Sequence, residues 1–304
     1  RTGVSAMAGT SELRRRMAGV RQTQKITRAM YLISSAKMRR AREELEHTRP
    51  YFDALRSEIE RIFRVDSGVP SCFFSSEDER CSDPVCGCLV ITADKGLAGA
   101  YNHNVLKAAQ SFLSAHPHTR LYVVGEYGRR WLERRGTEIE HSFLYTAQNP
   151  NLFRAREIAR TLLEAYEHGR LDEIDIIYTD LSGMTQCVRQ SRLLPLPRQR
   201  FRSGTPDAGA CFEFAPSLAD VLESVVKNYL SGYIYSALVD SFCSEQSARM
   251  AAMDAANQNA EELLSELSRR FSRARQGAIT QEITEISAGA RAQKNHSATE
   301  VKKT

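Results

Sequence analysis

Residues 253–278 read MDAANQNAEELLSELSRRFSRARQGA, and the spacing within this stretch decides the fold. Small or apolar residues and one Asn recur in alternating steps of four and three, at Met253, Asn257, Ala260, Leu264, Leu267, Phe271, Ala274 and Ala278. This is the heptad pattern of a coiled-coil seam. Residues 233–276 contain no Gly or Pro that would interrupt a helix. We therefore predict a long C-terminal helix over residues 216–290, followed by a polar tail over 291–304.

The partner for this seam is expected at the other end of the chain. Residues 11–64 also have helical spacing, through Leu13, Met17, Val20, Ile26, Met30 and Ile33 and then through Ala41, Leu45, Thr48, Phe52, Leu55, Ile59 and Ile62. Pro50 is expected to bend this helix without ending it. At 1.5 Å per residue the two helices would span roughly 75 Å and 105 Å. A domain of this size is only some tens of Å across, so we predict that the helices project from it as an antiparallel coiled coil.

The middle of the chain changes character. Apolar or alternating runs predict strands at 88–94, 120–126, 138–145, 173–181 and 186–196, and amphipathic stretches predict helices at 104–115, 127–136 and 152–169. Strand–helix alternation is typical of an α/β sheet with helices on its faces. We predict the α/β class, with a Rossmann-like domain over 88–197 inserted between the coiled-coil helices. Residues 65–87 are predicted to be a linker and 198–215 a connection.

Two motifs could carry chemistry, and neither fits its pattern. The sequence ADKGLAGAYN, residues 93–102, lacks the order of a phosphate-binding P-loop and of GxGxxG, so a tight turn that requires glycine is the preferred interpretation. The spacing of Cys72, Cys81, Cys86 and Cys88 matches no usual zinc pair. We expect no catalytic residue, no cofactor and no metal. An α/β enzyme with a helical arm, binding a ligand at 93–102, remains an alternative.

The N-terminal helix is strongly basic. From Leu13 to Arg42 there are ten Lys or Arg residues and no Asp or Glu. The charge run fits a solvated face, a nucleic-acid-binding rod, or a surface that meets acidic loops of a partner protein. Tyr31 is the single aromatic residue in the run, which disfavours stacking on single strands. No apolar run of about 18 residues occurs, so no transmembrane helix is expected.

Three separated stretches resemble one known family. These are RRRMAGVRQTQKITRAMYLISSAKMRRA (14–41), ITADKGLAGAYN (91–102) and the C-terminal residues 241–290. They resemble the gamma subunit of rotary, F-type ATP synthases. The resemblance implies a central rotor shaft that performs no bond chemistry and couples rotation of a proton-driven membrane ring to ATP synthesis by the beta subunits. It implies three alpha and three beta subunits, delta or epsilon central-stalk subunits and the membrane c-ring as partners, and no nucleic acid.

The resemblance also implies contact residues at matched positions. In the family, the position of Met30 lies beside an acidic loop of the beta subunit, and Lys25 and Arg28 would assist it electrostatically. Residues expected to contact the beta subunits, directly or through their neighbours, are Arg249, Arg275, Gln276, Gln281 and Glu282. Phe212 and Phe214 are expected at the foot, nearest the membrane ring.

The sequence also gives an expectation for the compartment. A first residue other than Met and seven cysteines favour the matrix side of the mitochondrial inner membrane. The region 198–215 contains one cysteine, Cys211, rather than the redox segment of plastid members. The bacterial plasma membrane is the alternative location.

Overall fold

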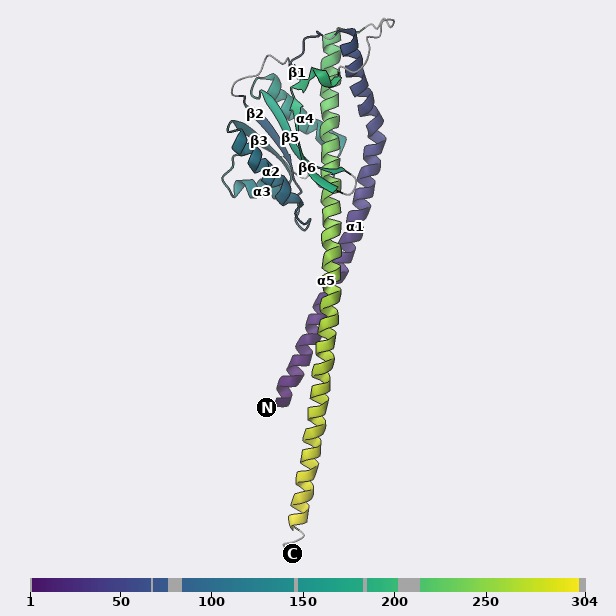
Figure 1. Ribbon diagram of the computed structural model, residues 1–304, viewed down its shortest axis with the longest axis vertical. Helices are drawn as coiled ribbons and strands as arrows, with labels where there is room; N and C mark the ends of the chain where they lie inside the picture. The colour runs from purple at the N-terminus through teal and green to yellow at the C-terminus, as the bar shows by residue number, and fades with distance from the viewer. Residues whose placement is uncertain are drawn as a thin grey trace. The chain divides into compact units, whose positions relative to one another are not determined.

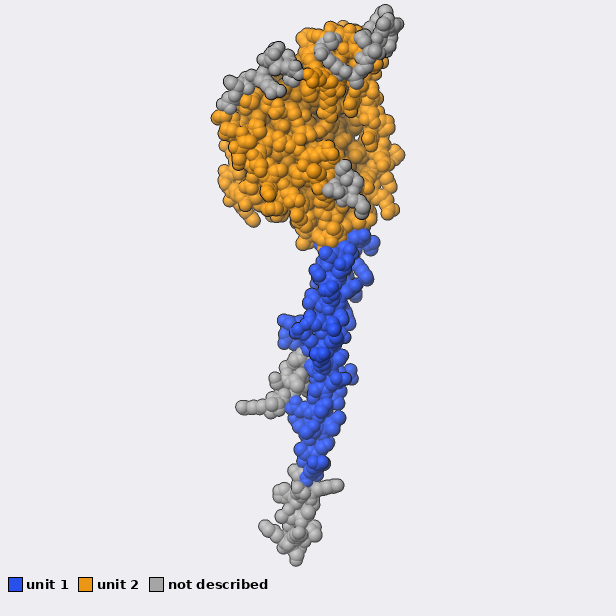
Figure 2. Space-filling model, in the orientation of Figure 1, with its two compact units in different colours: residues 1–32, 253–304 blue, residues 33–252 orange. Residues whose placement is uncertain are grey.

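The computed structural model describes the backbone of residues 2–300 except 67, 76–83, 145–146, 183–184 and 202–213. Contacts divide the chain into two compact units, which are coloured separately in Figure 2. Unit 1 contains residues 1–32 and 253–304, and unit 2 contains residues 33–252. Each unit is described by itself below.

Two long helices run through both units (Figure 1). Helix α1 spans Thr2–Val65 with Pro50 inside it, and α5 spans Leu218–Glu300. The two helices pack together in unit 1, where Thr27 donates a hydrogen bond to Asn257. They also pack together in unit 2, where the Phe52 and Tyr235 rings lie 6.3 Å apart. The predicted pairing of the chain's two ends, with an α/β sheet inserted between them, is confirmed.

Both long helices extend past their expected ends. Helix α1 begins at Thr2 rather than at residue 11. Helix α5 continues to Glu300, although a frayed tail was expected after residue 290. The reason is the absence of a stop signal, because residues 291–300 contain no Gly or Pro. At its start, α5 is capped by the Ser217 hydroxyl, which accepts a hydrogen bond from the Asp220 backbone N–H at 3.2 Å.

Unit 2 is built around a five-stranded sheet with the order β4-β3-β2-β5-β6. The strands are β2 (Cys86–Ile91), β3 (Thr119–Val124), β4 (His141–Phe143), β5 (Glu173–Ser182) and β6 (Thr185–Leu194). The first four are parallel and β6 runs antiparallel to β5. The connecting helices are α2 (Tyr101–Ala115), α3 (Glu126–Glu133) and α4 (Leu152–Glu167). The path reverses direction between β2 and β5, which is the topological switch point of a doubly wound sheet.

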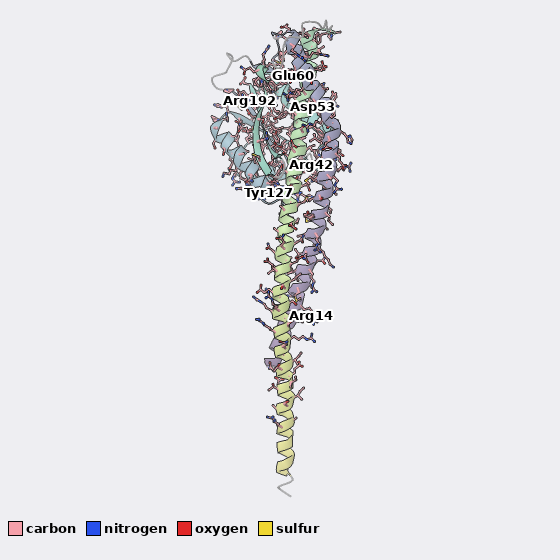
Figure 3. The ribbon with its side chains drawn as sticks, turned by 45° about the vertical axis from the view of Figure 1, so that its right-hand side comes forward. Arg14, Arg42, Asp53, Glu60, Tyr127 and Arg192 are labelled. Carbon is pink, nitrogen blue, oxygen red and sulfur yellow. The ribbon has the colours of Figure 1, made fainter. Side chains whose placement is uncertain are left out.

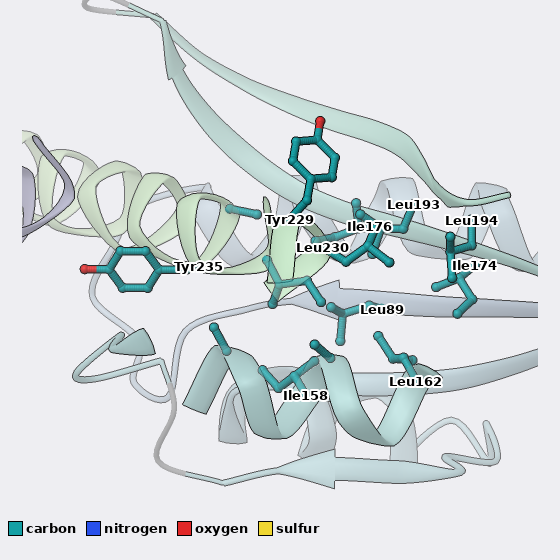
Figure 4. Close-up of a cluster of buried hydrophobic side chains, with 14 of the residues drawn as sticks. Leu89, Ile158, Leu162, Ile174, Ile176, Leu193, Leu194, Tyr229, Leu230 and Tyr235 are labelled. Carbon is teal, nitrogen blue, oxygen red and sulfur yellow. The ribbon is translucent and has the colours of Figure 1, made fainter. Parts of the chain in front are cut away.

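The two faces of the sheet carry different cores. In β2, Cys86, Cys88 and Val90 pack with α2 and α3 on one face. Leu89 and Ile91 point to the other face, where they join a larger cluster from α4, α1 and α5 (Figure 4). Successive side chains of a strand alternate between faces, so a strand that is buried on both sides is apolar throughout. This explains the continuous apolar run in β2.

One small sheet was not predicted. Strand β1 (Phe74–Ser75) pairs in parallel with β7 (Leu196–Pro197), and the short helix η1 (Arg198–Phe201) follows β7. The Phe74 ring lies 4.8 Å from Phe63 and 5.9 Å from Phe201. The predicted linker 65–87 therefore contains buried residues, which the paired Phe73 and Phe74 could have signalled. The prediction weighted the polar and turn-forming neighbours more heavily.

Candidate functional site

The N-terminal helix buries a regular but partly polar seam. Side chains along α1 are buried or half-buried in alternating steps of four and three, beginning at Leu13, Met17, Val20, Gln24 and Thr27. The predicted ladder placed Ile26 in the seam, and this was wrong, because Ile26 is 52% exposed and Thr27 is buried. Following only the apolar residues misplaces the buried stripe of the helix, because that stripe continues through the polar residues Gln24 and Thr27. Ile33, which belonged to the same apolar spacing, is likewise 55% exposed.

The C-terminal half of the seam in unit 1 follows the prediction. Met253, Asn257 and Ala260 are buried, and the later seam residues Leu264, Leu267, Phe271, Ala274 and Ala278 are half-buried. Arg14 lies over the Phe271 ring at 5.5 Å from its centroid. Leu264, Leu267 and Phe271 are only half-buried, and the buried Asn257 and Ala260 are polar or small, so this seam buries little apolar area.

Charged side chains cover the outside of unit 1. Arg14, which is labelled in Figure 3, is exposed, as are Arg21, Lys25 and Arg28. The Arg28 guanidinium lies 3.8 Å from the Glu261 carboxylate, and Gln24 donates to the same carboxylate at 3.1 Å. These contacts bridge α1 and α5 at the surface, where an ion pair contributes little to stability.

Most of the predicted contact residues lie on this surface. Lys25, Arg275, Gln276 and Glu282 are exposed, and Met30 is half-buried. Gln281 is half-buried and donates to the Glu285 carboxylate at 3.0 Å. Three further exposed residues were missed by sequence reasoning, namely Ile279, Ile283 and Ile286, which are 44%, 59% and 71% exposed. Their spacing of four and three places them on one face of α5, and that spacing was visible in the sequence.

The remaining predicted residues lie in or beside unit 2. Phe212 falls outside the described residues. Phe214 is half-buried and packs against the main core, so it is not a free surface residue. Arg249 is 9% exposed, and its guanidinium binds the Glu245 carboxylate at 2.5 Å and the Gly96 carbonyl at 3.1 Å.

The loop after β2, residues 92–100, lies at the switch point where doubly wound sheets bind ligands. Here α5 packs against it, with Ala248 contacting the buried group of Ala93, Ala98 and Tyr101. Gly125 has φ 98°, and a Cβ there would collide with the Thr92 backbone, so glycine is required where α3 begins. The loop's own glycines differ from Gly125, because a Cβ at Gly96 or Gly99 would meet nothing within 4 Å, and Gly99, at φ 54°, serves the conformation of the turn.

Two carboxyl groups near this loop have shifted pKa values. Burial raises the pKa of Glu245, although the neighbouring Arg249 opposes the shift. The hydrogen bond from Arg129 is the main cause that lowers the pKa of Glu126 to about 2; burial opposes the shift, and the hydrogen bond from Arg130 adds to it. Within the described part of the chain, no three His, Cys, Asp or Glu side chains are grouped so that they could hold a metal ion. Cys86 and Cys88 are buried in β2, and Cys81 lies outside that part.

The comparisons with known proteins agree with this architecture. A family model described as ATP synthase matches residues 9–293. The ATP synthase gamma chain of Caldanaerobacter subterraneus subsp. tengcongensis is 40% identical over 293 residues, which cover 93% of this chain and 99% of the relative. This chain belongs to the gamma-chain family of ATP synthases. The gamma chain of Acetivibrio thermocellus is 37% identical, over 95% of this chain and all of the relative.

Solved structures give the same fold. The central stalk and c-ring structure of the Tetrahymena thermophila mitochondrial ATP synthase matches with a TM-score of 0.56 and 24% identity, over 76% of this chain and 99% of that chain. A Euglena gracilis mitochondrial ATP synthase structure matches with a TM-score of 0.65 and 15% identity, over 94% and 95% of the two chains. As a gamma chain, the protein is a central-stalk rotor subunit of an F-type ATP synthase, and it is not the catalytic subunit. No helix in the described ranges is long and apolar enough to cross a membrane.

Proposed function

We propose that the chain is the turning shaft that couples proton-driven rotation of a membrane c-ring to conformational cycling of three beta subunits. The observation that carries this proposal is the division of surfaces in unit 1. A seam that fully buries few side chains holds α1 against α5. Cationic side chains, together with Ile279, Ile283 and Ile286, are exposed on the outside. One helix pair has no threefold symmetry, so three identical partners around it meet different faces. Each orientation then favours a different partner conformation, as differential binding requires.

The contacts proposed for this surface follow from its charge. Lys25 and Arg28 are exposed beside Met30, and they suit an acidic loop of a beta subunit. Arg275, Gln276, Gln281 and Glu282 offer donors and acceptors on α5 to the beta subunits. Arg249 was expected to join them, but its burial and its internal bonds argue for another role. The foot toward the c-ring, with delta or epsilon subunits beside it, was expected to include Phe212 and Phe214, but the packing of Phe214 against the main core argues against a direct contact by that ring.

Two finer points are also proposals. The coupling ion is proposed to be the proton, although one 33% identical relative, from Acetobacterium woodii, is described as sodium ion specific. The location is proposed to be the matrix side of the mitochondrial inner membrane, with the bacterial plasma membrane as the alternative. The bacterial gamma chains, which are 33–40% identical to this chain, favour the bacterial plasma membrane. Fractionation of the source cells, with antibody detection of the chain, distinguishes the two.

The test of the shaft is coupling in the assembled complex. The chain should co-purify with alpha and beta subunits in a ratio of one to three to three. Met30→Lys adds a cation beside the proposed acidic loops and should favour one orientation over the others. We expect the protons pumped per ATP hydrolysed to fall in this variant. Unchanged coupling would contradict the contact assignment.

A matched control is available on unit 2. Arg134 is exposed at the end of α3, so Arg134→Glu changes surface charge without touching the proposed surface. It should leave coupling unchanged, whereas Arg28→Glu should reduce it. Salt-sensitive binding of the purified chain to DNA or RNA, without alpha and beta subunits, would instead support the nucleic-acid-binding rod.

A further inference from the structure

The turn in the loop 92–100 is held in an unfavourable backbone conformation. Leu97 has φ 63° and is, among the described residues, the one non-glycine residue with a positive φ. An L-residue with a side chain of this size adopts that conformation only where its surroundings impose it. The Leu97 side chain is nevertheless 63% exposed, so burial of this side chain does not impose it. The restraint must come from the backbone on either side of it.

Contacts on the sheet side fix the beginning of the loop. The Ala93 N–H donates to the Asn102 side chain at 3.0 Å, and the Ala93 carbonyl accepts from the Tyr127 N–H at 3.1 Å. The Asp94 carboxylate accepts from the Glu126 N–H at 3.0 Å. These bonds tie residues 93 and 94 to α2 and α3. Within the turn itself, residues 95–99, the Ala98 carbonyl accepts from the Tyr101 N–H of α2 at 3.2 Å, so the turn is held to the sheet domain on the far side of Leu97.

On the near side of Leu97, the turn is contacted by α5. Arg249 Nη2 donates to the Gly96 carbonyl at 3.1 Å, directly before Leu97. Glu245, one turn earlier on α5, holds the same guanidinium at 2.5 Å. Both residues are buried, with 9% and 6% of their surface exposed. Moving the Arg249 guanidinium out to another subunit would break both bonds and leave the buried Glu245 carboxylate without its ion-pair partner, which is costly.

We propose that Arg249 is a positioning residue that clamps the Gly96 carbonyl, so that the 95–99 turn and its outward Leu97 are locked to α5. Glu245 orients the guanidinium for this bond. The clamp assigns to Arg249 a role inside the chain, in place of the partner contact expected from the sequence. It also fastens the sheet domain to the long helix at the switch point, where related folds hold a ligand.

The test measures opening of the turn in the full chain. Lys95 is exposed and begins the turn, so a lysine-specific protease reports local opening through cleavage after Lys95. Arg249→Met should speed that cleavage about tenfold or more, and Arg249→Lys should partly restore protection. Glu245→Gln should have an intermediate effect. The double variant Arg249→Met/Glu245→Gln should be cleaved after Lys95 no faster than Arg249→Met alone, because the two residues act as one unit.

The control uses the same chemistry elsewhere on the same helix. Arg270 pairs with Glu266 at the same spacing of four on α5, but both side chains are at least half exposed. Arg270→Met should leave cleavage after Lys95 unchanged. If Arg249→Met does not fold, Arg249→Lys and Glu245→Gln still test the clamp. Unchanged cleavage after Lys95 in a folded Arg249 variant would overturn it.

A second measurement, in the assembled ATP synthase, rests on the proposed function. The clamp predicts that Arg249→Met and Glu245→Gln, each tested alone, both reduce coupling. Loss of coupling in Arg249→Met alone, with normal cleavage and a neutral Glu245→Gln, would mean that Arg249 acts on a partner, and the clamp would be wrong. Failure of the contact assignment, with Met30→Lys neutral, leaves the cleavage result intact.

Discussion

The same two helices are packed in two different ways in the two units. In unit 2, α1 and α5 bury large apolar side chains such as Ile59, Ile62, Leu230 and Ile234 against each other or against the sheet domain. In unit 1, among the described side chains, they bury Thr27, Met253, Asn257 and Ala260. At about 25 cal/mol per Å² of apolar area, the first arrangement contributes far more stability per residue than the second.

The difference shows what each region needs from its surroundings. Unit 2 has large apolar clusters of its own on both faces of its sheet. Unit 1 keeps apolar residues such as Ile283 and Ile286 exposed while its seam is thin. A surface of this kind is expected where a partner covers it. Removing a core contact should therefore affect stability strongly in unit 2, whereas changes to the outside of unit 1 should affect partner binding.

The largest effect is expected for a core ring of unit 2. Phe201 is fully buried, and its ring lies 5.8 Å from Tyr229 and 5.9 Å from Phe74. Phe201→Ala leaves a cavity and should lower the free energy of unfolding by about 3–5 kcal/mol. Urea unfolding measures this. Phe153, 78% exposed, provides the control, since Phe153→Ala should change stability by less than about 0.5 kcal/mol. Equal effects of the two variants would mean that unit 2 has no such core.

A pH-dependent effect comes next. Burial, and then the charge of Asp180, raise the pKa of Asp240 to about 6, although Arg189, Arg42 and Arg49 oppose the shift. The unfolded value is about 3.9. The folded state therefore binds this proton more tightly, and the stability present below pH 4 is lost as pH rises through 6.

The Asp240→Asn variant isolates the contribution of the Asp240 carboxyl to the free energy of unfolding. At pH 7 it should be more stable than the parent by roughly 2 kcal/mol, and at pH 4 the advantage should vanish. Thermal or urea unfolding at both pH values measures the difference. A constant difference across this range would show that the Asp240 carboxyl is not perturbed.

The seam of unit 1 gives a smaller effect. Thr27→Val removes the bond between Thr27 and Asn257 and leaves the buried amide without that partner. We expect a loss of about 1–2 kcal/mol, measured as unfolding of the helical signal. Thr27→Val combined with Asn257→Leu should recover most of the loss, because both polar groups are then gone. A neutral single variant would mean that the polar pair does not hold the seam.

The smallest effect is expected at the surface of unit 1. The Arg28–Glu261 pair spans 3.8 Å between side chains that are 70% and 60% exposed. Arg28→Ala should change the free energy of unfolding by no more than about 0.5 kcal/mol. Adding Glu261→Ala should reveal no coupling between the two residues in a double-mutant cycle. A loss above 1 kcal/mol would mean that unit 1 depends on its surface charges for stability.

Sequence reasoning reached the pairing of the terminal helices, the seam at residues 253–278 and the alternation of strands and helices. It missed three things, each for a stated reason. The seam of α1 passes through Gln24 and Thr27, which an apolar ladder skips. Strand β1 has two residues, too few for a periodic signal. The positions 291–300 read as a frayed tail because their composition is polar, although no residue there breaks a helix.

The sequence by itself determined where the long helices and the five strands of the main sheet form and which stripe of α5 is buried in unit 1. These are local properties, because a helix repeats every 3.6 residues whatever lies beside it. Only the tertiary structure decided that Arg249 points inward to Gly96 while Arg275 stays exposed. Both are arginines on one helix, and the difference between them is set by what packs against each face. At Arg249 the folded sheet domain supplies the Gly96 carbonyl, which no spacing along the helix reveals. The Glu245 carboxylate, four residues earlier, is a neighbour that helix spacing predicts, but its burial is not.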